Sequence, residues 1–512
     1  MKRIVTCLAA ALFASAVAAT RPDAPGRLLI LNEDNDHFFK YPSSYMDVAH
    51  LEAYVDQLAA GGHVTHIHFC PTGGRASFDS KTWEPIWRGL DEYPPERTWF
   101  LYHRWATHAK MLHDKGIDPY AVWIRRCRER GISPWLAPRM NDVHDAAVSL
   151  TRFYRSTTFW RTHREYRLYP TYDKPSWYHH QFNYAHEAVR DDAYAMLAEL
   201  FERYDFDGLC LTGNAWFPRE TAEASAPVLT AFMRKVRRLA DAWEKTRGHR
   251  IGLATQASGS PEDMRRRGFD VGLLAREGVF DTVICATRTN GLDVPVEAWR
   301  KAFAGRPVKL VAGAYECMAF AKGEARFGYE AAMYRGWADV MAARGADGFH
   351  FWNLPYYPQE QAAVAEKGLD PVRTRNLPRT YVTIARGRPP FTLAAPRTVE
   401  TLVGTGTNGI PSVVLGFRGA PPSGLLSVSL NGVACVWERE EFIQKYRFEE
   451  NRRGREFETA LACQGRRYFF PPGSVRAGTN VVAMAATSER DEVIYFALHL
   501  EPEDRPTKET VK

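Results

Sequence analysis

The sequence predicts an α/β chain, a (β/α)8 TIM barrel followed by a smaller C-terminal β-sandwich. Eight short apolar runs alternate with helical patterns from residue 27 to about residue 370, the pattern of a closed parallel barrel. The pattern then changes to short strands separated by Gly and Pro. The 512 residues leave room for both parts, at about 150 residues per domain. An open, doubly wound sheet is the main alternative, but no G-x-G-x-x-G motif follows the first apolar run.

The predicted barrel strands are the apolar runs themselves. They lie at residues 27–31, 64–69, 133–137, 208–211, 250–254, 282–285, 308–312 and 348–352. Helix signals separate them, because Asp118 before Pro119 and Ser260 before Pro261 each predict a helix start, and Gly248 predicts the end of a long helix. We therefore expect the barrel domain to span residues 24–375.

The C-terminal region is predicted to form a β-sandwich over residues 385–501. Strand-forming runs at 413–417, 426–430 and 481–484 are separated by turn residues, and Asn431-Gly432 is a hairpin signal. The sequence of this region has no cluster of charged residues that would suggest a catalytic site, so we expect it to act as an accessory domain.

The first 18 residues have the pattern of a secretory signal peptide. Lys2 and Arg3 precede an apolar stretch, and Ala16-Val17-Ala18 supplies the small-x-small cleavage pattern. We expect the mature chain to begin near Ala19 and the protein to be secreted or periplasmic. No later segment approaches about 18 uncharged apolar residues, so no membrane partner is expected.

Composition narrows the classes of partner. The charge balance is 67 − 60 = +7 without a long basic run, which argues against nucleic acid, although a basic excess would suit an anionic substrate. The 14 Trp and 23 Tyr either fill a large barrel or line a wall for flat ligand faces.

Two long loops rich in aromatic residues, 71–117 and 139–187, are predicted to form the walls of a cleft. The cysteines have no C-x-x-C spacing, and whether Cys435 pairs with Cys463 stays open.

Polar residues follow the first predicted strand, at the barrel end where the active groups of such barrels lie. Glu33, Asp34, Asp36 and His37 fall within five residues. Three carboxylates this close repel unless a cation, a proton or a polar ligand compensates. We predict Asp36 as a catalytic carboxyl group and the other three as substrate-binding groups. The alternative is a loop held by Asx turns and an ion pair to a barrel arginine.

A second polar cluster follows the third predicted strand. Arg139, Asn141, Asp142 and His144 offer a bidentate donor, an amide, a carboxylate and an imidazole, which suit vicinal hydroxyls or a carboxylate. We predict Asp142 as catalytic and the other three as substrate-binding, with a structural salt-bridge cluster as the alternative. The acidic residues lack calcium-loop spacing, so neither metal nor cofactor is predicted.

The ends of the last two predicted barrel strands add three candidates. Glu316 follows the seventh strand and is the first candidate for a catalytic carboxyl group, with an ion pair to Arg288 as the alternative. Trp352 and Asn353 end the eighth strand, where the indole could stack on a sugar face and the amide could bind hydroxyl groups. The alternative for Trp352 is simple plugging of the barrel.

The motifs Asn-Glu-Asp-Asn-Asp-His-Phe-Phe from Asn32 and Pro-Trp-Leu-Ala-Pro-Arg-Met-Asn-Asp-Val-His-Asp from Pro134 resemble those of uncharacterised, secreted bacterial glycoside-hydrolase-like barrel proteins, roughly over residues 27–355. Residues 468–482 likewise resemble the last strands of jelly-roll accessory domains of glycoside hydrolases. The resemblance implies a (β/α)8 barrel that acts on or binds carbohydrate. Such proteins usually carry an acidic residue in or at the end of the fourth strand, where this chain reads Leu-Cys-Leu-Thr-Gly-Asn from Leu209.

These features together predict a secreted glycoside hydrolase acting on poly- or oligosaccharide. Hydrolysis by the common route needs one protonated carboxyl group and a second as base or nucleophile, and Glu316 with Asp142 or Asp36 would supply them. One alternative is a non-catalytic carbohydrate-binding barrel that has lost its acid in the fourth strand. Another is a lyase for anionic sugars that uses Arg139 and His144 with a tyrosine.

Overall fold

The fold is that of a computed structural model of the chain. The structure describes residues 27–34, 36–92, 100–147, 155–213, 215–286, 293–314, 317–318, 327–328, 330–352, 367–423, 426–447 and 458–503. The predicted signal peptide and the candidates Glu316 and Asn353 lie outside these residues, as does Arg288, the alternative partner of Glu316.

The strands of the first domain form one closed ring. They are β1 (Leu28–Glu33), β2 (His66–Phe69), β5 (Ser133–Leu136), β6 (Gly208–Leu211), β7 (Gly252–Ser258), β8 (Thr282–Ala286), β9 (Lys309–Ala314) and β12 (Gly348–Phe351). Within the described chain these eight parallel strands close in the order β1-β12-β9-β8-β7-β6-β5-β2. This confirms the predicted barrel, and each predicted run forms one strand, although β1, β7 and β9 continue two or more residues past their predicted ends.

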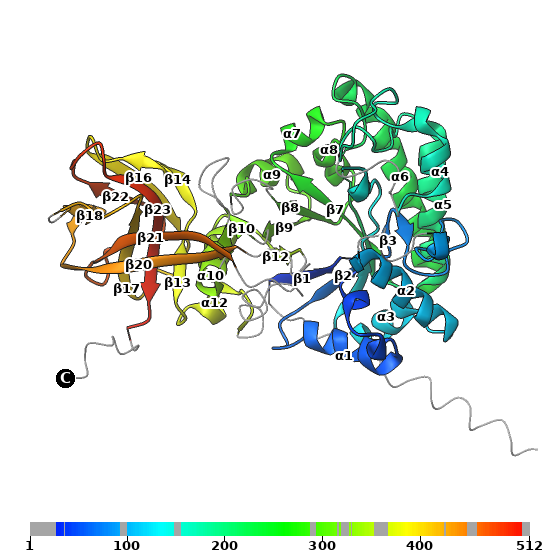
Figure 1. Ribbon diagram of the computed structural model, residues 1–512, viewed down its shortest axis with the longest axis horizontal. Coiled ribbons are helices and arrows are strands. Elements are labelled where there is room, and N and C mark those ends of the chain that lie inside the picture. Colours follow the sequence, from blue (N-terminus) through cyan, green and yellow to red (C-terminus); the bar gives the residue numbers. More distant parts are fainter. Residues whose placement is uncertain are drawn as a thin grey trace, which may run out of the picture.

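Helices surround the ring (Figure 1). They are α1 (Val48–Leu58), α2 (Phe100–Asp114), α3 (Pro119–Glu129), α4 (Thr158–Thr162), α5 (Glu187–Arg203), α6 (Ala222–Arg247), α7 (Pro261–Arg266), α8 (Val271–Arg276), α9 (Val296–Phe303) and α10 (Ala331–Ala343). The predicted punctuation is confirmed: Asp118 caps α3, Ser260 and Asp263 form a capping box on α7, and Gly248 ends α6 at φ +76°. No helix in the described part of the chain combines the length and the apolar character needed to cross a bilayer.

The largest side chain of the interior cluster of the barrel is Trp135. The indole of Trp135 lies across β6 and β7, where a Cβ atom on Gly208 or Gly252 would come within 2.3 or 2.6 Å of the ring. Its Nε1 donates to Ser133 Oγ at 3.1 Å, and its ring stacks on His68 with centroids 5.2 Å apart. The two glycines are therefore required by the space that this indole occupies.

Two imidazoles lie beside Trp135 in the same interior. The rings of His68 and His350 have centroids 6.0 Å apart, both are buried, and neither has a hydrogen-bond partner among the described residues. Burial lowers the pKa of His350 to about 3, and burial followed by the charge of His350 lowers that of His68. Both imidazoles are therefore neutral at physiological pH.

Two antiparallel sheets follow the barrel, which confirms the predicted sandwich. After the short helix α12 (Pro371–Thr374), the strands are β13 (Arg379–Tyr381), β14 (Ile384–Arg386), β15 (Phe391–Thr392), β16 (Arg397–Val403), β17 (Ile410–Phe417), β18 (Val428–Leu430), β19 (Val433–Ala434), β20 (Trp437–Arg447), β21 (Glu458–Phe469), β22 (Gly478–Met484) and β23 (Glu492–Glu501). One sheet has the order β13-β23-β17-β21-β20 and the other β14-β16-β22-β18-β19. Asn431 and Gly432, both with positive φ, turn β18 into β19, and Cys435 and Cys463 are free thiols.

The sandwich joins the barrel at α10 (Figure 1). The buried carboxylate of Asp339 on α10 accepts the hydroxyl of Tyr381 at 2.8 Å. It also accepts the backbone N–H groups of Thr405 at 3.1 Å and Gly406 at 3.3 Å. A buried carboxylate satisfied in this way fixes the sandwich to one helix of the barrel.

We predict that Gly208→Ala destabilises the barrel, because the new methyl group would overlap the Trp135 indole. Overpacking of this kind costs about 1–3 kcal/mol of unfolding free energy, which urea denaturation measures. Gly272→Ala in α8 is the control, since its Cβ would lie 3.5 Å from its nearest neighbour, an ordinary contact. Equal stability of the two variants would contradict the role given to Trp135.

We also predict that His350 makes the protein acid-sensitive. Its folded pKa of about 3 lies below the unfolded value of 6.5, so its contribution to stability is complete above pH 6.5 and is lost as the pH falls toward 3. The loss approaches about 1.4 kcal/mol per pH unit. Unfolding free energies at several pH values should therefore fall less steeply for His350→Gln and His350→Leu than for the native protein. Unchanged slopes in both variants would refute this prediction.

Candidate functional site

The carboxyl ends of β1 and β5 are linked by one arginine. Arg139, three residues beyond β5, donates from Nη1 to Asp142 Oδ2 at 2.8 Å and from Nη2 to Asp34, the residue after β1. All three side chains are largely buried, with 1–17% of each exposed. The guanidinium of Arg139 therefore compensates two carboxylates that come from different strands.

His144 extends this cluster toward solvent. Asp142 Oδ1 accepts the backbone N–H of His144 at 2.9 Å and makes a short contact with its Nδ1. The same Nδ1 also lies 3.2 Å from Arg139 Nη1, a group that can only donate. The shorter contact, to the carboxylate, favours a proton on Nδ1 and leaves Nε2 as an acceptor. Burial lowers the pKa of His144 to about 4, although Asp142 raises it in part. With 32% of the side chain exposed, His144 is a neutral, accessible base.

The two carboxyl groups on Arg139 are shifted in opposite directions. Burial raises the pKa of Asp34, and the opposing effect of Arg139 does not cancel it. Burial would also raise the pKa of Asp142, but His144, Arg155 and Arg139 outweigh it and hold that pKa well below the ordinary value. Such divergence is typical of sites in which one carboxyl group carries a proton and its neighbour stays ionised.

An aromatic loop borders the cluster, as predicted for the segment after β5. Trp177 is 48% exposed, and its ring meets His144 edge to face with centroids 4.1 Å apart. In the same loop Tyr172 stacks on His179 with centroids 3.8 Å apart. An exposed indole next to a neutral base suits a ligand with a flat apolar face and polar edges.

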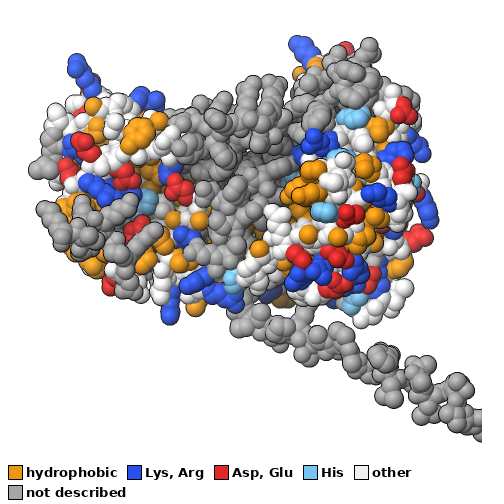
Figure 2. Space-filling model, turned by 60° about the horizontal axis from the view of Figure 1, so that its bottom comes forward, with side chains coloured by type: hydrophobic (Ala, Val, Ile, Leu, Met, Phe, Trp, Pro, Cys, Tyr) orange, Lys and Arg blue, Asp and Glu red, His pale blue; other side chains and the backbone are white. Residues whose placement is uncertain are grey.

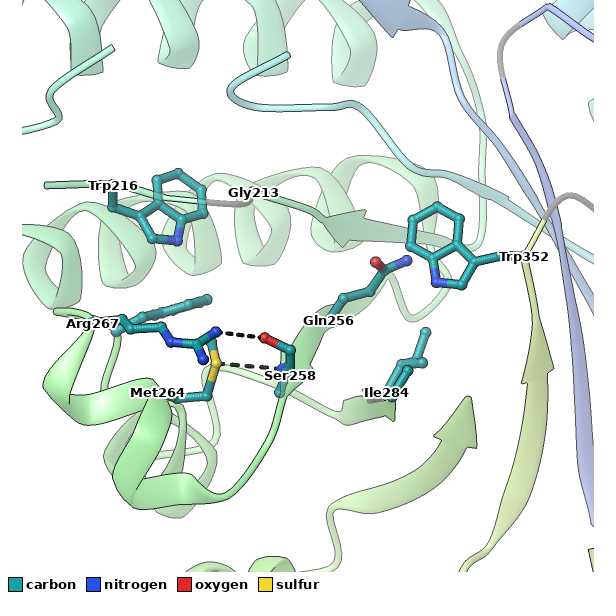
Figure 3. Close-up of a pocket in the computed structure, with 11 residues that line it drawn as sticks. Gly213, Trp216, Gln256, Ser258, Met264, Arg267, Ile284 and Trp352 are labelled. Carbon is teal, nitrogen blue, oxygen red and sulfur yellow. Dashed lines mark hydrogen bonds between the residues drawn. The ribbon is translucent and has the colours of Figure 1, made fainter. Parts of the chain in front are cut away.

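A pocket opens over the carboxyl ends of β6, β7, β8 and β12 (Figure 3). The space inside it that is open to water-sized groups is about 100 Å³. Figure 3 shows Trp216 and Trp352 on two sides, with Gln256 between them. Ser258 at the end of β7 and Arg267 just beyond α7 complete its polar lining. The predicted candidate Trp352 thus lines a pocket rather than only plugging the barrel.

Asp36 and His37 lie next to the cluster but are engaged elsewhere. Asp36 pairs with Lys40 at 2.8 Å, and this ammonium outweighs the effect of burial, so the pKa of Asp36 is lowered. His37 is buried, which lowers its pKa to about 3, and its Nδ1 accepts the N–H of Asp34 at 3.3 Å. Both residues therefore hold the loop that carries Asp34.

Glu33 does not face the mouth of the barrel. In the register of β1 and β2 it lies opposite Phe69, whose ring stacks on Trp123 of α3, so its side chain lies in the layer between strands and helices. Burial and the nearby carboxylates of Asp34 and Asp36 raise its pKa well above the ordinary value. The structure thus separates Glu33 from its neighbour Asp34, because successive side chains of a strand point to opposite faces.

Asn141 ties two loops together. Its Nδ2 donates to the carbonyl groups of Phe182 at 2.9 Å and Ala215 at 2.8 Å, and its Oδ1 accepts the N–H of Phe182 at 2.8 Å. Both of its donors are occupied by backbone, which gives it a positioning role. Among the described residues no group of three or more His, Cys, Asp or Glu side chains could hold a metal ion.

Four residues of the site were not predicted from sequence. Gln256 and Ser258 belong to β7 beyond its predicted end, and their alternation after Ala254 was the available signal. Trp216 and Arg267 come from loops after β6 and α7, and no local pattern singles them out.

Comparison with known proteins gives distant structural similarity only. No protein-family model and no curated protein matches the sequence. A cycloisomaltooligosaccharide glucanotransferase from Paenibacillus sp. matches 93% of this chain at TM-score 0.35 and 10% identity, and the chain spans 57% of that protein. The PgaB glycoside hydrolase domain from Bordetella bronchiseptica matches 67% of this chain and 98% of its own at TM-score 0.42 and 10% identity. A maltogenic alpha-amylase from Thermotoga neapolitana matches 90% and 99% at TM-score 0.38 and 11% identity.

Proposed function

We propose that the protein is a carbohydrate-active enzyme that cleaves glycosidic bonds at the carboxyl end of its barrel. The observation that supports this most is the pair of carboxyl groups on Arg139, because the pKa of Asp34 is raised while that of Asp142 is lowered. Glycosidic hydrolysis by the common route needs one carboxyl group that can carry a proton and a second carboxylate as base or nucleophile. In this proposal Asp142 acts through the imidazole of His144, which is the base.

In this proposal each residue of the cluster has a distinct role. Asp34 carries the proton that passes to the glycosidic oxygen as the bond to the leaving sugar breaks. His144 accepts a proton at Nε2 from the water that adds to the anomeric carbon, and Asp142 stabilises the imidazolium that forms. Trp177 offers a flat face to the sugar ring beside this base. Export of the protein is part of the same proposal.

A second candidate is elimination from an anionic sugar. The observation that favours it is the neutral imidazole of His144, oriented by Asp142 and placed near the cation Arg139. In that reaction His144 Nε2 removes the proton next to the sugar carboxylate, Asp34 gives a proton to the leaving oxygen as its C–O bond breaks, and a double bond remains in the product. Hydrolysis leaves no such double bond, so ultraviolet absorbance of the product separates the two reactions.

We predict that His144→Gln lowers kcat on the cleaved polysaccharide by about 10²- to 10⁴-fold, since it removes the base. The measurement is release of reducing ends from a polysaccharide panel by the mature protein. His249→Gln is a matched control, because His249 also contacts a carboxylate, Asp205 at 2.7 Å, but precedes β7 at the opposite end of the barrel. If both variants keep native activity and melting temperature, His144 is not the base.

The pH profile gives an independent check on the dyad. The pKa of His144 of about 4 places the acid limb of kcat/KM near pH 4. Asp142→Asn removes an anion that raises this pKa, so the acid limb should move to lower pH while kcat falls. If the acid limb of the Asp142→Asn variant stays at the native pH, Asp142 does not influence the pKa of the base.

Glu316 remains a proposed catalytic carboxyl group; Asp36 is paired with Lys40 and Asp142 with Arg139, so ion pairing does not choose between them as its partner. We predict that Glu316→Gln lowers kcat by about 10²- to 10⁴-fold with little change in melting temperature. Unchanged turnover with a large fall in melting temperature would show an ion-pair role instead. A panel in which sugars bind but are never cleaved would favour a carbohydrate-binding barrel.

A further inference from the structure

The pocket over β6, β7, β8 and β12 is chemically distinct from the Arg139 cluster. The carboxylates of that cluster are joined to Arg139, whereas the described residues that line the pocket include a cation and an amide and no carboxylate side chain. Its two indoles, Trp216 and Trp352, stand on opposite sides of the polar groups (Figure 3). Its described lining therefore offers donors and flat faces.

The amide of Gln256 is a donor without an acceptor. Its Nε2 is buried and has no hydrogen-bond partner among the residues that the structure describes, while the residue lines the pocket. A buried donor left unpaired costs about 1–3 kcal/mol, so such groups usually mark a place where a ligand or water supplies the acceptor. In Figure 3 the amide points toward Trp352.

Arg267 supplies the positive charge at the lip of the pocket. Its Nη1 donates to Ser258 Oγ at 2.8 Å, and no carboxylate of the described chain lies within ion-pair distance of it. The preceding arginines differ, since Arg265 and Arg266 both pair with Glu262, at 2.9 and 3.1 Å. The remaining N–H groups of Arg267 are thus available to an anion from solution.

The width of the pocket depends on a glycine. A Cβ atom on Gly213 would lie 2.4 Å from the ring of Trp216, which packs edge to face on Tyr184 with centroids 4.6 Å apart. Tyr184 therefore restrains the indole of Trp216 on one side, and any side chain at position 213 would displace it. This fixes one wall of the pocket.

We infer that this pocket binds a uronate-type sugar unit of the substrate, with the sugar carboxylate on Arg267 and Ser258. Gln256 Nε2 then donates to a sugar hydroxyl, and the indole of Trp352 contacts the apolar face of the ring. The inference rests on the proposed function in one respect, that the substrate is a carbohydrate. It adds that the substrate is acidic, which also suits the net charge of +7.

The test is calorimetric binding of two matched sets of probes to the mature protein. One set contains oligomers of galacturonate, mannuronate and glucuronate, and the other contains the same oligomers with each carboxylate reduced to a primary alcohol. We expect at least one acidic oligomer to bind tenfold or more tightly than its reduced counterpart, and Arg267→Gln to remove that preference. Arg266→Gln is the matched control, because it removes the same charge from the neighbouring position, where the side chain pairs with Glu262.

Gln256→Leu separates the amide from the cation. This substitution should weaken the binding of the acidic oligomer and of its reduced counterpart by a similar factor. The preference for the acidic oligomer should therefore remain. The inference fails if no acidic oligomer is preferred over its reduced form, or if Arg267→Gln and Arg266→Gln behave alike. Binding is measured separately from turnover, so the two proposals can fail independently. A protein that cleaves a neutral polysaccharide but does not prefer acidic oligomers would contradict this inference and would still support the proposed function.

Discussion

Closing eight parallel strands into a ring forces their inward-facing side chains into one narrow interior, and the rest of the molecule depends on how that interior is filled. Trp135 occupies most of the space between β5, β6 and β7, and it can do so only because Gly208 and Gly252 carry no side chain. The same closure brings the carboxyl ends of all strands to one edge. Loops far apart in the sequence, after β1, β5, β6, β7 and β12, therefore share one face of the barrel.

On that face, burial and charge act against each other around Arg139. Its guanidinium compensates carboxylates from two strands, yet the outcome differs because their other surroundings differ. Asp142 is also near Arg155 and hydrogen-bonds His144, and its pKa is held low, whereas burial and nearby carboxylates raise the pKa of Asp34. The result is a group that can carry a proton, a permanent anion and an imidazole that the anion orients, all within one hydrogen-bonded cluster.

In our proposals, one half of the carboxyl face of the barrel carries out the chemistry and the other half recognises the substrate. The half built on β1 and β5 is rich in mutually compensated charges, which suits proton transfer. The half built on β6, β7, β8 and β12 has an unpaired amide donor, Arg267 and two indoles, which suits recognition of a sugar that carries an acid. The sandwich is anchored through Asp339 on α10 and through the ion pair of Lys445 with Glu330, and neither contact uses a residue of either half.

The sequence by itself determined the barrel, the sandwich and the cluster that follows β5, because these depend on local signals. Apolar periodicity marks strands, caps such as Asp118 and Ser260 mark helix starts, and residues just beyond a barrel strand reach its active edge. Only the tertiary structure decided which neighbours share a pocket. Glu33 and Asp34 are adjacent in sequence, yet the two-residue period of a strand places them on opposite sides of the sheet. Arg267 contacts Ser258 only because α7 packs back against β7.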